Sequence, residues 1–498
     1  MITKVFGPPG TGKTTFLLSR VEQELQSVHS SRIGYFSFTR KAAHEARDRA
    51  VVKFPHLNAD TDFPWFRTLH SLAYQCLGVS AKEMLAPKDY AEFARQVGLE
   101  ISTSSDGEDF VTRADNVILN AINIARIRSE DLHTYYNRSN LGIEWFHFEF
   151  VERSYRQFKA DKMLLDFTDL LERLVEAPDL LPVLEVLIID EAQDLSPLQW
   201  RLVHQLAERA ARTFIAGDDD QAVFTWAGAD VPSFLNCPGE ALVLDRSYRI
   251  PSSVHALANS VVSRIQRRQD KTWSPRAETG DIQWYMRFED VDVTEGNWLI
   301  LASTNYMLDD VYEWLKAQGL LFERHGQRSI ADAVLTAVIG WERLRSGKAV
   351  PATVVQQIYK NLGTEYVKRG FRSLKTLDGQ DIFSADDLIK HHGLVGVEDP
   401  WYEALTKIGA ERRDYLRAVL RRGVKLGDKP RINVSTIHGA KGGEADNVLL
   451  LTDLSPKFAA DYAVNGDDIN RLLYVGITRT RQTLHIIRPK RDDRGFRL

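Results

Sequence analysis

The sequence predicts an α/β protein built on two parallel β-sheets, and two observations lead to this fold class. Short β-branched, apolar runs recur along the chain with helical patterns between most of them, which is typical of parallel sheets covered on both faces. A first set of runs (residues 2–6, 33–38, 186–190, 213–216 and 241–244) is followed by a second set (298–302, 432–436, 448–451 and 483–487). Two such sheets indicate paired domains with a cleft between them.

The length and the spacing of these runs predict the domain organisation. With 498 residues the chain is too long for one core, and roughly three or four domains or subdomains are expected. Residues 79–161 and 331–430 lack clean strand alternation, and we expect mainly helical insertions there. The first core then comprises residues 1–78 and 162–243, and the second comprises 244–330 and 431–498.

The composition indicates a globular protein and argues against a membrane protein or a disulfide-rich one. The chain is 44% apolar and 27% charged, the ordinary balance of a soluble globular protein. No apolar stretch reaches the ~18 residues of a membrane span, and no signal region begins the chain, so no membrane partner is expected. Only Cys76 and Cys237 are present, which excludes a disulfide scaffold or a cysteine-based metal site and suits a reducing cytoplasm.

Charge gives no global indication of a nucleic-acid partner, because the net charge is −4. A bound polyanion would have to lie in a local groove. Residues 411–431 do carry eight Lys or Arg against three acids. Such a cluster is either a solvated helix face or part of a polyanion site, and the sequence leaves both open.

A phosphate-binding loop follows the first apolar run. It matches the pattern G-x-x-x-x-G-K-[ST], in which glycines let backbone N–H groups point at phosphate oxygens. Lys13 adds a positive charge at the β- and γ-phosphates, and the Thr14 hydroxyl is a ligand for Mg²⁺. Thr15 opens a helix whose positive end faces the anion. The expected nucleotide contacts are Gly7, Pro8, Pro9, Gly10, Thr11, Gly12, Lys13, Thr14 and Thr15.

Two later strands end in polar residues that complete a hydrolytic site. The run 186–190 ends at Asp190, a ligand for Mg²⁺, and Glu191 beside it can accept a proton from the attacking water. The run 213–216 leads to Gln221, which is placed to touch the γ-phosphate. Trp226, five residues on, offers a flat face to a base, although an aromatic residue near a loop is more often part of a core.

The order of motifs resembles the UvrD/Rep/PcrA helicases of superfamily 1A. The segments are GPPGTGKT, FSFTRKAAHEARDR, RTLHS, LDFTDLL, IIDEAQD, GDDDQAVFTWAGA, LDRSYRIPSSV, STIHGAKGGEADNV and RLLYVGITRTR. They extend from Gly7 to Arg481, with gaps in the two insertions. The resemblance implies two RecA-like cores, each with a mainly helical insertion, that bind ATP and Mg²⁺ between them.

The resemblance also assigns residues to the nucleotide and to DNA. It implies that Arg249 and Arg479 are arginine fingers, for which a planar guanidinium is suited. Tyr248 would stack on adenine, and Glu444 would contact the ribose. It implies a single-stranded DNA track, gripped by stacking and backbone contacts without reading sequence. The residues of this track are Phe38, Thr39, Thr68, His70, Trp226, Thr436 and His438.

Several positions depart from the family pattern. The adenine-reading glutamine segment is not among the six residues before Gly7, so selectivity for ATP is either relaxed or supplied by another segment. Ala227 replaces the usual arginine, Ala445 the phenylalanine and Thr480 the alanine, and residues 331–430 form a reduced insertion. These changes leave the hydrolytic residues intact.

Two functions fit the sequence. The first is an ATP-dependent single-stranded DNA translocase and 3′-to-5′ helicase that acts on single-stranded and tailed duplex DNA. The second is a DNA-stimulated ATPase switch that remodels or recruits a protein partner without processive unwinding. An RNA helicase fits less well.

Overall fold

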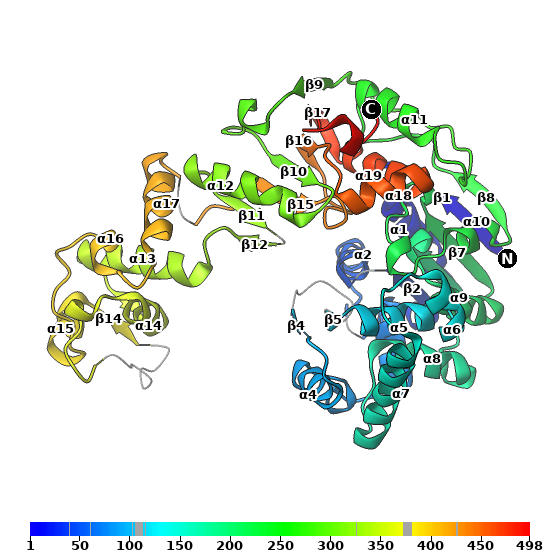
Figure 1. Cartoon of the computed structure of the whole chain (residues 1–498), viewed down its shortest axis with the longest axis horizontal. Coiled ribbons are helices and arrows are strands. Elements are labelled where there is room, and N and C mark those ends of the chain that lie inside the picture. Colours follow the sequence, from blue (N-terminus) through cyan, green and yellow to red (C-terminus); the bar gives the residue numbers. More distant parts are fainter. Residues whose placement is uncertain are drawn as a thin grey trace. The chain divides into compact units, whose positions relative to one another are not determined.

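The computed structural model describes residues 1–38, 40–59, 61–101, 103–104, 113–114, 116–324, 326–371, 381–424 and 427–498. The chain forms two compact units (Figure 1). Unit 1 comprises Met1–Thr279 and Asn465–Tyr474, and unit 2 comprises Gly280–Val464 and Val475–Leu498. The sequence assigns residues 244–279 and 465–474 to the second core, whereas in the structure their contacts group them with unit 1.

Unit 1 is built on a six-stranded sheet with the order β3-β2-β6-β7-β1-β8. Every strand pair described in this sheet is parallel. The strands are β1 (Ile2–Phe6), β2 (Ile33–Ser37), β3 (Phe66–Arg67), β6 (Val186–Asp190), β7 (Arg212–Gly217) and β8 (Glu240–Val243).

Helices cover both faces of this sheet, because alternate strand residues enter two separate cores. Phe6, Phe36 and Ile189 pack on one face against α3 (Leu69–Cys76), α8 (Phe167–Glu176), α9 (Pro197–Arg209) and α10 (Val231–Asn236). Val5, Tyr35 and Ile188 pack on the other face against α1 (Lys13–Glu24) and α2 (Arg40–Lys53). Burial on both faces explains why the central strands β2 and β6, buried along their whole length, are mainly apolar.

The first insertion is mainly helical and has its own apolar core, to which α4, α5 and α7 contribute. Arg126 in α5 and Lys159 in α7 form ion pairs of 2.6 to 2.7 Å with Asp166 and Asp169 at the start of α8. These buried pairs fix the insertion on the sheet domain. Its elements are α4 (Pro87–Val97), β4 (Thr103–Ser104), β5 (Arg113–Ala114), α5 (Val117–Ile127), α6 (Leu132–Arg138) and α7 (Trp145–Lys162). Helix α11 (Ser252–Val262) also belongs to unit 1.

Unit 2 contains a seven-stranded sheet with the order β12-β11-β15-β10-β16-β17-β9. Its described pairs are parallel except for the antiparallel pair of β11 and β12. The strands are β9 (Asp281–Tyr285), β10 (Trp298–Ala302), β11 (Phe322–Arg324), β12 (Gln327–Arg328), β15 (Ile432–Thr436), β16 (Ala445–Leu451) and β17 (Thr480–Ile487).

The second insertion shares one apolar core with the sheet of unit 2. It consists of α13 (Asp332–Arg345), α14 (Ala352–Asn361), α15 (Ala385–His391), α16 (Trp401–Ala404) and α17 (Ala410–Arg421), with a short hairpin of β13 (Val350–Pro351) and β14 (Ile382–Phe383). Unit 2 also contains α12 (Asp309–Ala317) and α18 (Pro456–Val464), whereas α19 (Gly466–Ile477) belongs to unit 1 up to Tyr474.

The prediction of an α/β fold with two parallel sheets is confirmed. Strands β1, β6, β10 and β15 have the predicted bounds, whereas β3, β9, β11 and β12 were not predicted. Within the ranges that the structure describes, no helix combines the length and apolar composition needed to cross a lipid bilayer.

Candidate active site and nucleic-acid interface

The loop after β1 is held at both ends by backbone geometry. The Gly7 N–H donates to the Gly217 carbonyl at 2.9 Å, which ties the loop to the end of β7. The Thr11 hydroxyl donates to the Pro8 carbonyl at 2.8 Å and closes the turn. Gly12 has φ +75°, a left-handed conformation that favours glycine, and α1 begins at the next residue.

Lys13, Thr14 and Thr15 therefore lie in the first turn of α1, where backbone N–H groups have no intrahelical acceptor. Such a turn is a ready site for an anion, and the helix dipole adds to it. The structure thus brings the predicted loop residues together around one helix start.

The side chain of Lys13 reaches the predicted acid pair at the end of β6. Its Nζ lies 2.6 Å from Glu191 Oε1 and 3.6 Å from Asp190 Oδ1. Burial alone would lower the pKa of Lys13, but the Glu191 and Asp190 carboxylates outweigh it and hold the pKa above its ordinary value. The ammonium is therefore charged and placed between the loop and both acids.

Asp190 has a partner that the sequence did not predict. The Tyr35 hydroxyl, on β2, donates to Asp190 Oδ2 at 2.8 Å. Burial, followed by the charge of Asp190, holds the pKa of Tyr35 well above its ordinary value, so the phenol remains a donor at neutral pH. This bond fixes the orientation of a carboxylate that is only 2% exposed.

The two residues predicted to hold Mg²⁺ both carry oxygen donors. Thr14 supplies a hydroxyl and Asp190 a carboxylate, and Mg²⁺ prefers hard oxygen ligands. Because Tyr35 holds Asp190 in one orientation, the carboxylate is prepared for such a role.

Glu191 occupies an unusual backbone conformation. Its φ is +55°, in the left-handed region that non-glycine residues rarely adopt, and such strain is common at active sites. Gln193, fully buried, donates to Glu191 Oε2 at 2.6 Å and accepts from the Asp218 N–H at 2.9 Å. Gln193 therefore joins Glu191, the predicted base, to the turn after β7. The sequence did not predict this role, because Gln193 is uncharged and stands among acidic residues that carry the motif.

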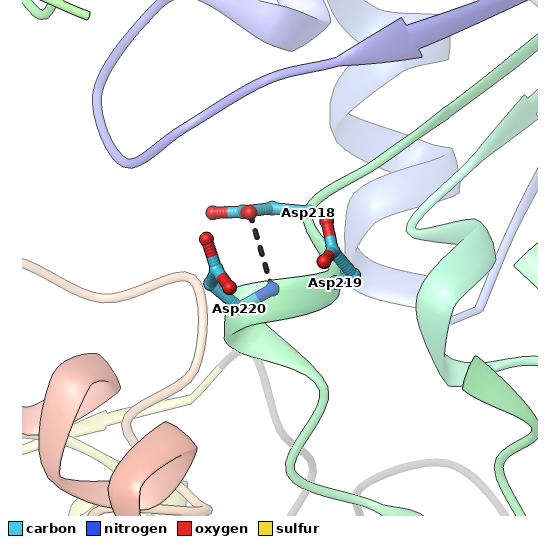
Figure 2. Close-up of side chains that lie close together, drawn as sticks. All are labelled: Asp218, Asp219 and Asp220. Atoms are coloured by element: carbon cyan, nitrogen blue, oxygen red, sulfur yellow. Dashed lines mark hydrogen bonds between the residues drawn. The ribbon is translucent and has the colours of Figure 1, made fainter. Parts of the chain in front are cut away.

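The turn after β7 contains Gln221 in a 3₁₀ segment, Asp219–Gln221. Gln221 Nε2 donates to Asp218 Oδ2 at 2.7 Å, which fixes the plane of the amide. Asp218 and its two acidic neighbours form a buried cluster (Figure 2) that pairs with Lys271. The sequence did not predict Lys271, because it lies about fifty residues away in a segment with no motif of its own.

Residues 247–249 lie against the phosphate-binding loop within unit 1. The Ser247 hydroxyl donates to the Pro9 carbonyl at 2.7 Å, and the Tyr248 N–H donates to the Gly10 carbonyl at 2.8 Å. A Cβ at Gly10 would lie 2.4 Å from Arg249 Cβ, so only glycine permits this approach. Tyr248 is 66% exposed beside the loop. The sequence places Arg249 in the second core, whereas in the structure it belongs to unit 1.

The other predicted nucleotide residues lie in unit 2. Arg479 is 2% exposed, and its guanidinium donates to the carbonyls of Val475 (3.0 Å) and Gly443 (3.4 Å). Glu444 forms an ion pair with Arg481. The Ala445 N–H donates to the Arg479 carbonyl at 3.1 Å, so the structure brings the predicted finger and the predicted ribose contact together.

Three aromatic rings form a row at the predicted DNA site. Phe38 stacks on Phe224 with ring centroids 5.5 Å apart and an angle of 26°. Phe224 in turn contacts Trp226 at 6.4 Å, and Trp226 is 50% exposed. Phe224 was not among the predicted residues, although its position two residues before Trp226 is a usable signal. The row, Phe38–Phe224–Trp226, offers the flat surfaces that stacking on bases requires.

The loop that carries Trp226 is held from both sides. Arg128, just after α5, donates to the Thr225 carbonyl at 2.7 Å. The Thr225 hydroxyl donates to Asp468 at 2.9 Å. Trp226 is therefore exposed on a loop that is itself well fixed.

The remaining predicted DNA contacts have structural partners of their own. Thr68 is 2% exposed and its hydroxyl accepts from the Ser71 N–H, so it caps α3. Burial first, and then the charge of Arg40, lower the pKa of His70 to about 3, so its imidazole is neutral. Thr39 lies outside the described residues.

The last two predicted DNA contacts lie at the C-terminal end of β15, in unit 2. The Thr436 hydroxyl accepts from the Gly439 N–H at 3.1 Å, and the His438 ring contacts Phe458 at 6.4 Å. Thr436 is the last residue of β15, and His438 belongs to the turn that follows it. Their roles toward DNA stay predictions.

Comparisons with known proteins agree with this geometry. Residues 2–241 match the family model of the UvrD/REP helicase N-terminal domain, and residues 414–491 match that of the UvrD-like helicase C-terminal domain.

Similar proteins include DNA helicase II of Haemophilus influenzae, 23% identical over 434 residues, which cover 82% of this chain and 56% of the relative. DNA helicase II of Escherichia coli is 26% identical over 310 residues, 58% of this chain and 42% of the relative. ATP-dependent DNA helicase PcrA of Bacillus subtilis is 26% identical over 302 residues, 55% and 39% respectively. The chain thus spans about half the length of these relatives.

Proposed function

Since the chain belongs to the UvrD/REP helicase family, we propose that it is an ATP-driven single-stranded DNA translocase that unwinds duplex DNA from 3′ to 5′. The observation that carries the proposal is the short connection between Gln221 and the aromatic row. Gln221 and Trp226 are five residues apart on one fixed turn, and Phe224 lies between them. A change at the γ-phosphate can therefore reach the DNA platform through a few residues.

ATP hydrolysis uses residues of unit 1 that meet at the end of β6. Lys13 neutralises phosphate charge, and Glu191, held by Gln193, accepts the proton of the attacking water. Gln221 orients that water or contacts the γ-phosphate through an amide whose plane Asp218 fixes. Thr14 and Asp190 would hold Mg²⁺, which when bound would neutralise further charge at the phosphates.

Binding of the nucleotide involves residues beyond the phosphate-binding loop. Tyr248 stacks on adenine through its ring, which is exposed beside Gly10, and so contributes to recognition of the base. Arg249 and Arg479 neutralise charge that develops on the γ-phosphate, and Glu444 contacts the ribose. For Arg479 this role requires that its guanidinium exchange backbone carbonyls for phosphate oxygens.

Single-stranded DNA stacks on the row Phe38–Phe224–Trp226, which explains binding without base specificity. The predicted backbone contacts of the strand are Thr39, Thr68, His70, Thr436 and His438. Hydrolysis and release of the nucleotide alternate the grips of Phe38 and Trp226 on the strand, which moves it in one direction.

The decisive test is an unwinding assay on duplexes with a 3′ tail, a 5′ tail or no tail. We expect ATP-dependent strand separation on the 3′-tailed duplex only. Glu191→Gln is the matched control, because it keeps the size of the side chain and the ATP site but removes the base. Unwinding from the 5′ tail would contradict the polarity.

Hydrolysis that single-stranded DNA stimulates, without strand separation on any duplex, would instead support an ATPase switch that remodels or recruits a partner. Equal stimulation by RNA and DNA strands would contradict the assignment of DNA as substrate. A DNA substrate and two free cysteines, Cys76 and Cys237, are consistent with a reducing compartment that contains DNA, the cytoplasm of a bacterium or of a phage-infected host.

A further inference from the structure

Three consecutive acidic side chains converge on the turn that follows β7 (Figure 2). Asp218, Asp219 and Asp220 are at most 1% exposed, and carboxylate oxygens of all three lie within 4.8 Å of one another. The Asp220 N–H donates to Asp218 Oδ1 at 3.3 Å. Three like charges buried together repel one another and need cations at close range.

The chain supplies these cations from one segment of unit 1. Lys271 Nζ lies 2.8 Å from Asp218 Oδ1 and 2.8 Å from Asp220 Oδ2, and it also forms an ion pair with Asp219. Arg268 donates to both oxygens of Asp220, each at 2.9 Å. The ammonium of Lys271 thus stands where a metal ion would otherwise be expected, and the cluster is not a metal site.

Burial alone would lower the pKa of Lys271, which is 1% exposed. The three carboxylates outweigh this effect and hold the pKa above its ordinary value. Three negative and two positive charges leave the cluster at −1.

The two oxygens of Asp218 connect this cluster to the hydrolytic residues. Oδ1 accepts from Lys271, whereas Oδ2 accepts from Gln221 Nε2 at 2.7 Å. The Asp218 N–H donates to Gln193, which also holds Glu191. The Asp218 carboxylate therefore helps to fix the orientation of Gln221, while Lys271 and the Asp220 N–H hold its other oxygen.

We propose that Lys271 is a positioning residue for ATP hydrolysis, which acts by fixing Asp218 and through it the amide of Gln221. This inference rests on the proposed function, because it assumes that Gln221 acts at the γ-phosphate. The segment around Lys271 has two more connections to the same turn. The Gln269 N–H donates to Asp219 at 2.8 Å, and Arg471 of α19 donates both to the Asp219 carbonyl at 3.0 Å and to the Arg267 carbonyl at 2.6 Å.

The test is a double-mutant cycle on the full chain with Lys271→Met and Gln221→Ala. The rate of ATP hydrolysis is measured at saturating oligo(dT) over a range of ATP concentrations. It is expressed per nucleotide-binding protein molecule, counted from the stoichiometry of binding of a non-hydrolysable ATP analogue. We expect Lys271→Met to lower kcat by about 10²-fold with little change in the KM for ATP, the scale of a misplaced reacting group. In the Gln221→Ala protein, Lys271→Met should lower kcat only slightly further, because the residue through which Lys271 acts is already absent.

A second variant protects the test against loss of folding. Asp219→Asn combined with Lys271→Met keeps the cluster at −1, since one acid and one base are removed together. We expect its melting temperature to recover while its kcat remains low. Asp270→Asn, at an exposed partner of Arg268, is the matched control and should turn over like the wild type.

The outcomes separate the inference from the proposed function. If wild-type protein shows no DNA-stimulated hydrolysis, the proposed function fails. If the wild type is active but Lys271→Met costs the same in both backgrounds, or the charge-balanced double variant regains full kcat, then Lys271 serves stability alone and only the inference is overturned.

Discussion

Removal of the Trp226 ring tests the placement of DNA on unit 1. Stacking of one base on an aromatic side chain contributes about 1–3 kcal/mol. Trp226→Ala should therefore weaken binding of an oligo(dT) strand by roughly 5- to 150-fold, since each ~1.4 kcal/mol is a factor of ten. Fluorescence anisotropy with a labelled strand measures this directly, and a change of base sequence should not alter the loss.

The same substitution also affects stability, and the structure sets an upper limit to this effect. A tryptophan buries up to ~250 Å² when fully covered. Trp226 is 50% exposed, so roughly 125 Å² is at stake, which at ~25 cal/mol/Å² is at most about 3 kcal/mol. Thermal unfolding on the same preparation therefore separates a lost stacking contact from a weakened fold.

Trp284→Ala is the matched control, because this tryptophan in β9 is 46% exposed and packs under Arg488 rather than in the aromatic row. It should leave strand affinity unchanged. A stable Trp226→Ala protein with unchanged DNA affinity and unchanged DNA-stimulated ATPase would refute the stacking role and the path of the strand over unit 1.

Three further predictions follow from the site. Lys13→Ala and Glu191→Gln should each abolish ATP turnover, the second with ATP still bound, and full activity in Glu191→Gln would remove the acid pair from the mechanism. Arg249→Ala or Arg479→Ala should slow hydrolysis by ~10³-fold or more with a smaller loss of ATP binding; an equal loss of both would count against a finger role. The folded chain holds the pKa of His70 at about 3, against about 6.5 when unfolded, so the unfolded state binds more protons as pH falls below 6.5 and stability should decline. Denaturant midpoints of wild type and His70→Gln between pH 7.5 and 5 should converge at low pH, and parallel curves would contradict this.

Sequence patterns were sufficient to predict an element or motif wherever the residues that define it are neighbours in the chain. Strands β1 and β6 were predicted with their bounds, most clearly β6, which is buried along its whole length and is a continuous apolar run up to Asp190. The phosphate-binding loop and the pair of Asp190 and Glu191 were equally readable, since each places its chemistry at the end of such a strand. The sequence by itself therefore determined the fold class and the positions of the phosphate-binding loop and the acid pair at the ends of strands.

Only the tertiary structure decided the contacts between distant residues. Strands β3 and β11 have two and three residues, too few for a periodic pattern, and they exist because a neighbouring strand pairs with them. Tyr35 lies 155 positions before Asp190, and Lys271 lies 53 positions after Asp218.

No local pattern marks such a partner, because burial and pairing arise only when the chain has folded. The hydrogen-bond and ion-pair partners of the candidate site were for this reason invisible in the sequence, whereas the candidate catalytic residues, which lie at the ends of strands, could be predicted.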